Sequence, residues 1–93
     1  MRLDKWLVNT GLVPRRTRAQ QACDAGLVEI EGKRAKSSSE VRVGQTITLR
    51  LGLRVTRYEV LDVPERPVAR EQREDCRRLL SEERLELDAE TDW

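Results

Sequence analysis

The spacing of apolar residues in this 93-residue chain has the period of a helix before Gly26 and the period of a strand from Gly26 to about Leu61. Apolar side chains at i, i+3, i+4 and i+7 predict a helix over residues 2–10 that ends before Gly11. Its inward positions are Leu3, Trp6, Leu7 and Thr10. A stripe of small residues predicts a second helix over residues 16–25, ended by Gly26. Its members are Ala19, Ala22 and Cys23.

Beyond Gly26 apolar and polar residues alternate, which is typical of half-buried strands. We expect strands at residues 28–30, 46–51 and 54–61, with a tight turn at Glu31-Gly32 and a polar loop over residues 33–40. The inward residues of the second strand are expected to be Ile47, Leu49 and Leu51. The expected fold class is α+β, with two packed helices on a small antiparallel sheet.

The last third of the chain is expected to lie outside the sheet. Pro64 and Pro67 end the expected sheet, and the highly charged segment from Pro67 to about Leu85 predicts a helix. Its narrow apolar patch is Cys76, Leu79 and Leu80. We therefore divide the chain into a domain over residues 1–62 and a charged helical extension over residues 63–93.

Composition narrows the possible functions. No apolar run approaches the roughly 20 residues that span a membrane, and no signal peptide is evident, so we expect a cytoplasmic protein that binds no membrane. The chain has no His, and Cys23 and Cys76 form no C-x-x-C pair, so we expect reduced thiols, no metal and no cofactor. Only scattered carboxylates or Cys23 could support catalysis, so we expect a protein that is not an enzyme, and a monomer.

Charge is distributed unevenly along the chain. Residues 1–60 hold twelve Lys/Arg and six Asp/Glu, whereas residues 61–93 hold six and eleven. A basic body favours a polyanionic partner, although the two oppositely charged parts could equally pair with each other.

The positive charge is densest at the start of the second expected helix, at Arg15, Arg16 and Arg18. Cations there oppose the helix dipole, so a nucleic-acid phosphate, bound by helix N–H groups and arginine forks, would fit the site. A solvated basic face is the structural alternative, and a DNA-binding helix-turn-helix is the functional one. The cations that could extend the surface are Arg2, Lys5, Lys33, Arg34 and Lys36.

Four stretches of the chain, in their order and spacing, resemble the alpha-L RNA-binding domain first seen in ribosomal protein S-four. They are RLDKWL (2–7), RRTRAQ (15–20), AGLVEIEGK (25–33) and AKSSSEVRVGQTITL (35–49). The resemblance covers about residues 1–61. It extends to the small stand-alone members, namely a factor of bacterial ribosome-associated quality control and the fifteen-kilodalton ribosome-associated heat-shock protein.

The resemblance implies a non-catalytic protein that binds the large ribosomal subunit, through 23S rRNA and P-site peptidyl-tRNA, during rescue of stalled ribosomes. A factor that tails the stalled chain is an implied partner. The alternative is an RNA-targeting subunit for a separate enzyme that modifies rRNA or tRNA.

Carried onto this sequence, the resemblance makes Arg2 and Arg16 the principal RNA contacts, with further contacts beside them. The full set of expected RNA-binding residues is Arg2, Lys5, Arg15, Arg16, Thr17, Arg18, Lys33, Arg34 and Lys36. Asp4 is expected either to orient an arginine or to serve only as a favourable first-turn carboxylate.

Two positions depart from the family pattern. Arg15 stands where many relatives cap the second helix with Ser or Thr, so the cap must come from elsewhere. Glu31 stands where Asn usually precedes Gly32, which leaves the geometry of that turn open.

Overall fold

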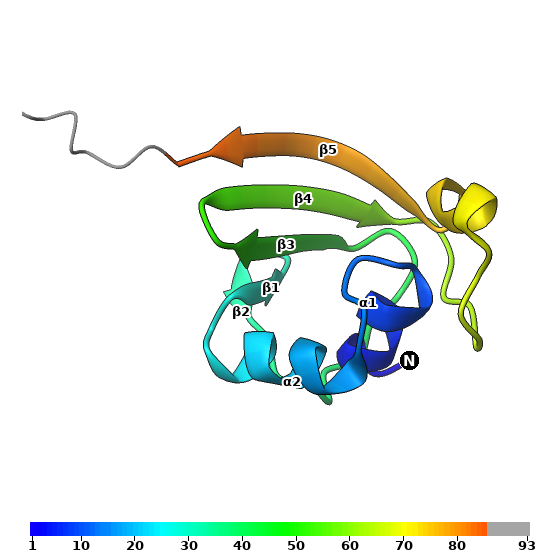
Figure 1. Cartoon of the computed structure of the whole chain (residues 1–93), viewed down its shortest axis with the longest axis horizontal. Helices are drawn as coiled ribbons and strands as arrows, with labels where there is room; N and C mark the ends of the chain where they lie inside the picture. Colours follow the sequence, from blue (N-terminus) through cyan, green and yellow to red (C-terminus); the bar gives the residue numbers. More distant parts are fainter. Residues whose placement is uncertain (86–93) are drawn as a thin grey trace, which may run out of the picture.

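The computed structural model describes residues 1–85, which form one antiparallel sheet with two α-helices beside it. The sheet order is β2-β1-β3-β4-β5 (Figure 1). The elements, in chain order, are α1 (Leu3–Asn9), α2 (Arg16–Asp24), β1 (Val28–Ile30), β2 (Lys33–Arg34), β3 (Thr46–Leu51), β4 (Arg54–Val60), the 3-10 helix η1 (Arg70–Asp75) and β5 (Arg77–Arg84).

Both predicted α-helices are confirmed, with ends that follow from local chemistry. After α1, Gly11 adopts a φ of +82°, and the N–H groups of Leu12 and Val13 donate to the carbonyl of Leu7 at 3.0 and 3.1 Å. Gly26 ends α2 with a φ of +78°. Glycine occupies this left-handed region without strain, so both helices stop at these residues. None of the helices within residues 1–85 is long and apolar enough to cross a membrane.

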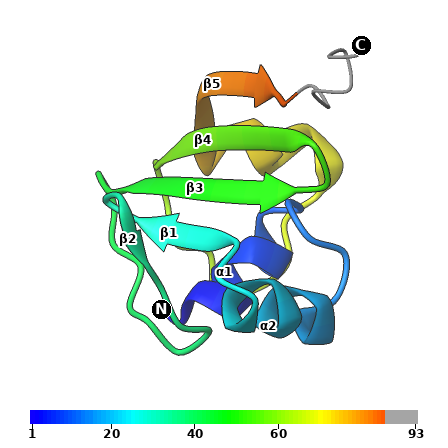
Figure 2. The ribbon, with the colours of Figure 1, turned by 90° about the vertical axis from the view of Figure 1, so that its left-hand side faces the viewer.

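The core lies between the two helices and the β1–β3 part of the sheet. Figures 1 and 2 show α1 and α2 next to β1 and β3, with β5 farthest from them. Trp6 is fully buried, as predicted, and its indole N–H donates to the carbonyl of Asp62 at 2.9 Å. The other buried members of this core are Leu3, Leu7, Val13, Ala19, Ala22, Cys23, Val28, Ala35, Val41, Ile47, Leu49 and Val60.

The Glu31-Gly32 turn is tight, as predicted. Glu31 and Gly32 have φ of +54° and +81°, the pair of positive values that a two-residue type I′ hairpin requires. The Glu31 carboxylate accepts a hydrogen bond from the backbone N–H of Thr46 at 2.6 Å, which ties the turn to β3. The turn leads directly into β2, so the first two residues of the expected loop over residues 33–40 form a short strand instead.

The predicted C-terminal helix is wrong. Only a six-residue 3-10 helix and strand β5 occupy this segment, and β5 pairs antiparallel with β4. Leu79 and Leu80 are 51% and 48% exposed, so the supposed apolar patch does not form a helix face. The charged side chains of β5 pair with those of β4 instead. Intrinsic helix propensity is weak, and pairing with a neighbouring strand overrides it. These pairs are Arg54–Glu82, Arg57–Glu83 and Arg78–Glu59.

Leu51 is 43% exposed rather than inward, because it ends β3 and borders an open groove with Leu12 and Leu53. Residues 86–93, the end of the expected extension, lie outside the described residues, and the division at residue 62 stays a prediction.

The segment after β4 returns to α1. The side-chain amide of Asn9 donates to the carbonyl of Pro64 at 2.9 Å, and the N–H of Val68 donates to the carbonyl of Asn9 at 3.0 Å. The guanidinium of Arg77 then donates to the carbonyl of Thr10 at 2.9 Å, at the C-terminal end of α1. These bonds fix residues 62–68 along α1, beside the site described below.

Replacing Ile47 by alanine should lower the free energy of unfolding by about 2–5 kcal/mol, because the side chain is fully buried between sheet and helices. Val43→Ala is the control, since Val43 is 61% exposed, and it should change stability by less than about 0.5 kcal/mol. Urea unfolding followed by circular dichroism measures both. Equal losses for the two variants would contradict this core.

Candidate nucleic-acid interface

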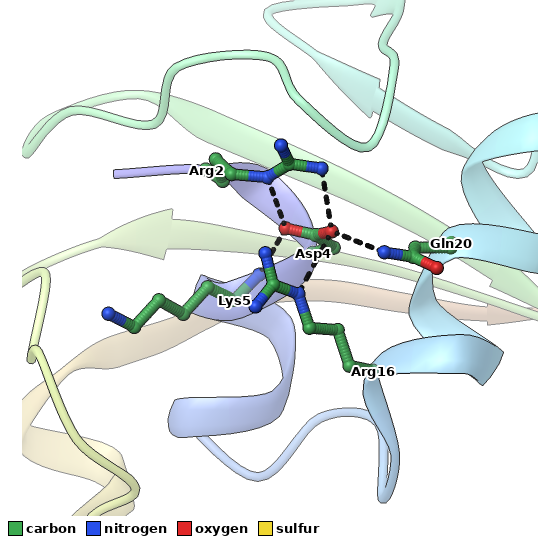
Figure 3. A network of polar contacts seen from close by, with 5 residues as sticks. All are labelled: Arg2, Asp4, Lys5, Arg16 and Gln20. Atoms are coloured by element: carbon green, nitrogen blue, oxygen red, sulfur yellow. Dashed lines mark hydrogen bonds and ion pairs between the residues drawn. The ribbon is translucent and has the colours of Figure 1, made fainter.

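The carboxylate of Asp4 is fully buried in the first turn of α1, where five N–H groups reach it. Arg2 donates twice, from Nε at 3.2 Å and Nη2 at 3.1 Å, and the backbone N–H of Lys5 donates at 2.8 Å. From α2, Nε of Arg16 donates at 3.2 Å and Nε2 of Gln20 at 3.0 Å (Figure 3). Asp4 therefore joins the two helices and orients two arginines at once.

The N-terminal end of α1 is held by the loop before β3. The N–H of Leu3 donates to the carbonyl of Ser39 at 2.8 Å, and the N–H of Asp4 donates to the carbonyl of Ser37 at 3.1 Å. These bonds satisfy helix-end donors that have no partner within a helix. They also fix the position of Asp4 relative to the loop.

The hydrogen bonds to Asp4 control its ionisation. Burial alone would raise the pKa of this carboxyl, but hydrogen bonds from Arg2, Gln20 and Arg16, together with the charge of Arg16, outweigh burial and hold the pKa at about 2. Asp4 is therefore ionised at neutral pH and keeps both guanidinium groups in place.

The two arginines remain available to a ligand. Their side chains are 48% (Arg2) and 51% (Arg16) exposed, and each uses only part of its set of five N–H donors on Asp4. Both line an open groove of about 380 Å³. Its remaining lining residues are Met1, Lys5, Val63 and Glu65. Figure 3 shows the Lys5 side chain pointing away from Asp4.

The other cations of α2 surround its first turn. Arg15 is the N-cap residue of α2, and no side-chain cap hydrogen bond forms at this end within residues 1–85. The side-chain cap that Ser or Thr would supply therefore has no replacement among the described side chains. Arg15, Thr17 and Arg18 are all exposed. A helix start surrounded by exposed arginines favours an anion.

The expected RNA-binding residues after the β1–β2 turn form a second group. Arg34 donates to the carbonyl of Asp24 at 2.7 Å and so caps the C-terminal end of α2. Arg34 and Lys36 line a separate groove of about 460 Å³, while Lys33 is exposed on β2. Arg2, Lys5 and Arg16 thus share one groove, whereas Arg34 and Lys36 line a different one.

Sequence reasoning missed four members of the site, namely Met1, Gln20, Val63 and Glu65. Gln20 lies four residues after Arg16, and this spacing places both side chains on one face of α2, so helical periodicity could have found it. Val63 and Glu65 reach the groove only because residues 62–68 are bound to α1. No local sequence signal marks that placement.

Cys23 is a packing residue rather than a nucleophile. Its side chain is 2% exposed, and burial, with smaller effects of Asp4 and Asp24, raises the pKa of the thiol to about 11. The thiol therefore stays protonated at neutral pH. No cluster of three or more potential metal-ligating side chains occurs in the part of the chain that the structure describes.

The low pKa of Asp4 predicts a pH dependence. The folded-state pKa lies below that of the unfolded chain, so its contribution of about 2 kcal/mol is present above pH ~4 and disappears as the pH falls through about 2. Asp4→Asn lacks this contribution at every pH. Urea unfolding of both proteins between pH ~4 and about 2 should show their free energies of unfolding converging as the pH falls. A difference in free energy that stays constant with pH would contradict the ion-pair account.

Comparisons with known proteins identify the family of this chain. A family model described as the S4 domain matches residues 1–47. The RQC P-site tRNA stabilizing factor of Bacillus subtilis is 35% identical over 85 residues, covering 91% of this chain and 98% of the relative. The factor of the same name from Helicobacter pylori strain 26695 is 42% identical over 64 residues, covering 69% of this chain and 76% of the relative.

Solved structures show the same fold. Heat shock protein 15 of Vibrio cholerae, described as trimeric, superposes with a TM-score of 0.82 and 28% identity, over 87% of this chain and 82% of that one. The solution structure of a hypothetical protein superposes with a TM-score of 0.75 and 36% identity, over 89% of this chain and 100% of that one. The resemblance found in the four sequence stretches is confirmed, and the chain belongs to the S4-domain family, with RQC P-site tRNA stabilizing factors among its relatives.

Proposed function

We propose that this protein binds RNA on the large ribosomal subunit, through 23S rRNA and P-site peptidyl-tRNA, and holds the tRNA in place during rescue of stalled ribosomes. The names of its relatives, which refer to ribosome quality control and to the P-site tRNA, support this role. The proposed action is binding without catalysis, in the cytoplasm, beside a factor that extends the stalled chain.

The observation that carries the proposal is the pair of half-exposed guanidinium groups fixed on Asp4. An arginine that must be ordered on binding loses up to about 2 kcal/mol of side-chain entropy. Arg2 and Arg16 are held by hydrogen bonds before RNA arrives, so less of this cost remains. Their unused donors suit phosphate oxygens, which arginine binds through paired N–H groups.

Neighbouring cations, together with the hydroxyl of Thr17, would extend the contact. Lys5 shares the groove with both arginines, and Arg15, Thr17 and Arg18 surround the start of α2. Lys33, Arg34 and Lys36 would form a second contact with the RNA backbone. Arg34 has a structural role as well, because it caps α2. The mechanism is an electrostatic clamp that follows the RNA backbone rather than its sequence.

The experiment is sedimentation of the tagged protein from lysate through a sucrose gradient. The wild type should migrate with free large subunits that carry tRNA. Arg2→Ala/Arg16→Ala should leave these fractions, because loss of two charge-assisted contacts lowers affinity by about tenfold or more. The control is Arg70→Ala/Arg84→Ala, which removes the same charge from two exposed arginines outside the groove and should sediment like wild type.

Two results would contradict the proposal. One is a wild-type protein that is missing from every ribosomal fraction. The other is equal sedimentation of the two double variants, provided that circular dichroism shows both to be folded, because the bound surface would then lie elsewhere.

A further inference from the structure

The groove lined by Arg2, Lys5 and Arg16 also holds a carboxylate and two apolar side chains, those of Glu65, Met1 and Val63. We propose that this groove takes one unpaired guanosine nucleotide of the bound RNA, with its phosphate on Arg2 and Arg16 and the edge of its base on Glu65. This inference rests on the proposed RNA-binding function and adds a nucleotide preference to it.

Glu65 is placed in the groove by bonds on both sides of it. The carbonyl of Asp62 accepts from the Trp6 indole at 2.9 Å, and the carbonyl of Pro64 accepts from Asn9 at 2.9 Å. Beyond Glu65, the N–H of Val68 donates to Asn9 at 3.0 Å. The backbone around Glu65 is therefore bound to α1, the helix that also carries Asp4 and Lys5.

Glu65 is not used to neutralise the cations around it. Three cations line the same groove, yet none of the ion pairs within residues 1–85 includes Glu65. An unpaired carboxylate repels any phosphate that approaches it. Its presence is favourable only if the ligand brings hydrogen-bond donors to this part of the groove.

Guanine supplies those donors best. Its Watson–Crick edge presents two adjacent donors, at N1 and N2, which match the two oxygens of a carboxylate. The same edge of adenine, cytosine or uracil places an acceptor next to its single donor, and that acceptor would face the carboxylate. Proteins read unpaired RNA bases through such edges, while the face of the base contacts other side chains.

The rest of the groove suits the other parts of one nucleotide. Val63 offers apolar surface to the face of a base, and the two guanidinium groups offer donors to its phosphate. The volume of about 380 Å³ is at the small end of the usual range for ligand sites, roughly 300–1,000 Å³.

The test uses five RNA hairpins that differ only in one unpaired nucleotide: guanosine, inosine, adenosine, cytidine or uridine. Fluorescence anisotropy with the full chain should show the guanosine hairpin bound about tenfold more tightly than the adenosine hairpin. Inosine should fall between them, since it lacks the N2 amino group. Glu65→Gln should abolish the preference, because its amide replaces one acceptor with a donor. Glu71→Gln, an exposed change in η1, should retain it.

Equal wild-type affinity for all five hairpins would overturn the inference, as would a Glu65→Gln variant that binds all five more tightly by the same factor. The second result would mean that Glu65 only repels phosphate. Either failure is distinguishable from failure of the proposed function, in which Arg2→Ala/Arg16→Ala binds every hairpin as tightly as wild type.

Discussion

The buried carboxylate of Asp4 is the interaction on which the rest of the site depends. An unpaired buried charge is costly, so this position is stable only with its donors in place. The donors come from Arg2, Lys5, Arg16 and Gln20, on both sides of the contact between α1 and α2. The same bonds that satisfy the carboxylate set the direction of two arginines at the surface, so the stability of the helix pair and the geometry of the candidate site have one origin.

Helix α1 is where the remaining constraints meet. A helix of seven residues is too short to be stable alone, so it must be held by its surroundings. The loop at Ser37 and Ser39 holds its first N–H groups, residues 62–68 bind along its length, and Arg77 binds its last turn. Strand β5 is therefore part of this arrangement: it pairs with β4 and sends Arg77 back to α1.

The sequence allowed the helices, β1, β3 and β4 to be predicted, because each depends on local periodicity and has a glycine within two residues of one of its ends. Arg2, Asp4 and Arg16 could be selected as site residues on the family resemblance. The C-terminal strand could not be predicted, since its charges look like a solvated helix until Glu59, Arg57 and Arg54 of β4 are placed opposite them. Glu65 was missed for the same reason: its position depends on bonds to Trp6 and Asn9, more than fifty residues away in the chain.

The proposed role of Arg2 and Arg16 is a clamp on RNA phosphates. Its most direct test is the slope of log affinity against log salt concentration for one structured RNA. Each phosphate contact contributes about 0.7–0.9 to this slope, so Arg2→Ala/Arg16→Ala should reduce its magnitude by about 1.5, and Arg70→Ala/Arg84→Ala should leave it unchanged. Equal slopes for wild type and both double variants would contradict the clamp, because the counterions released on binding would then come from another surface.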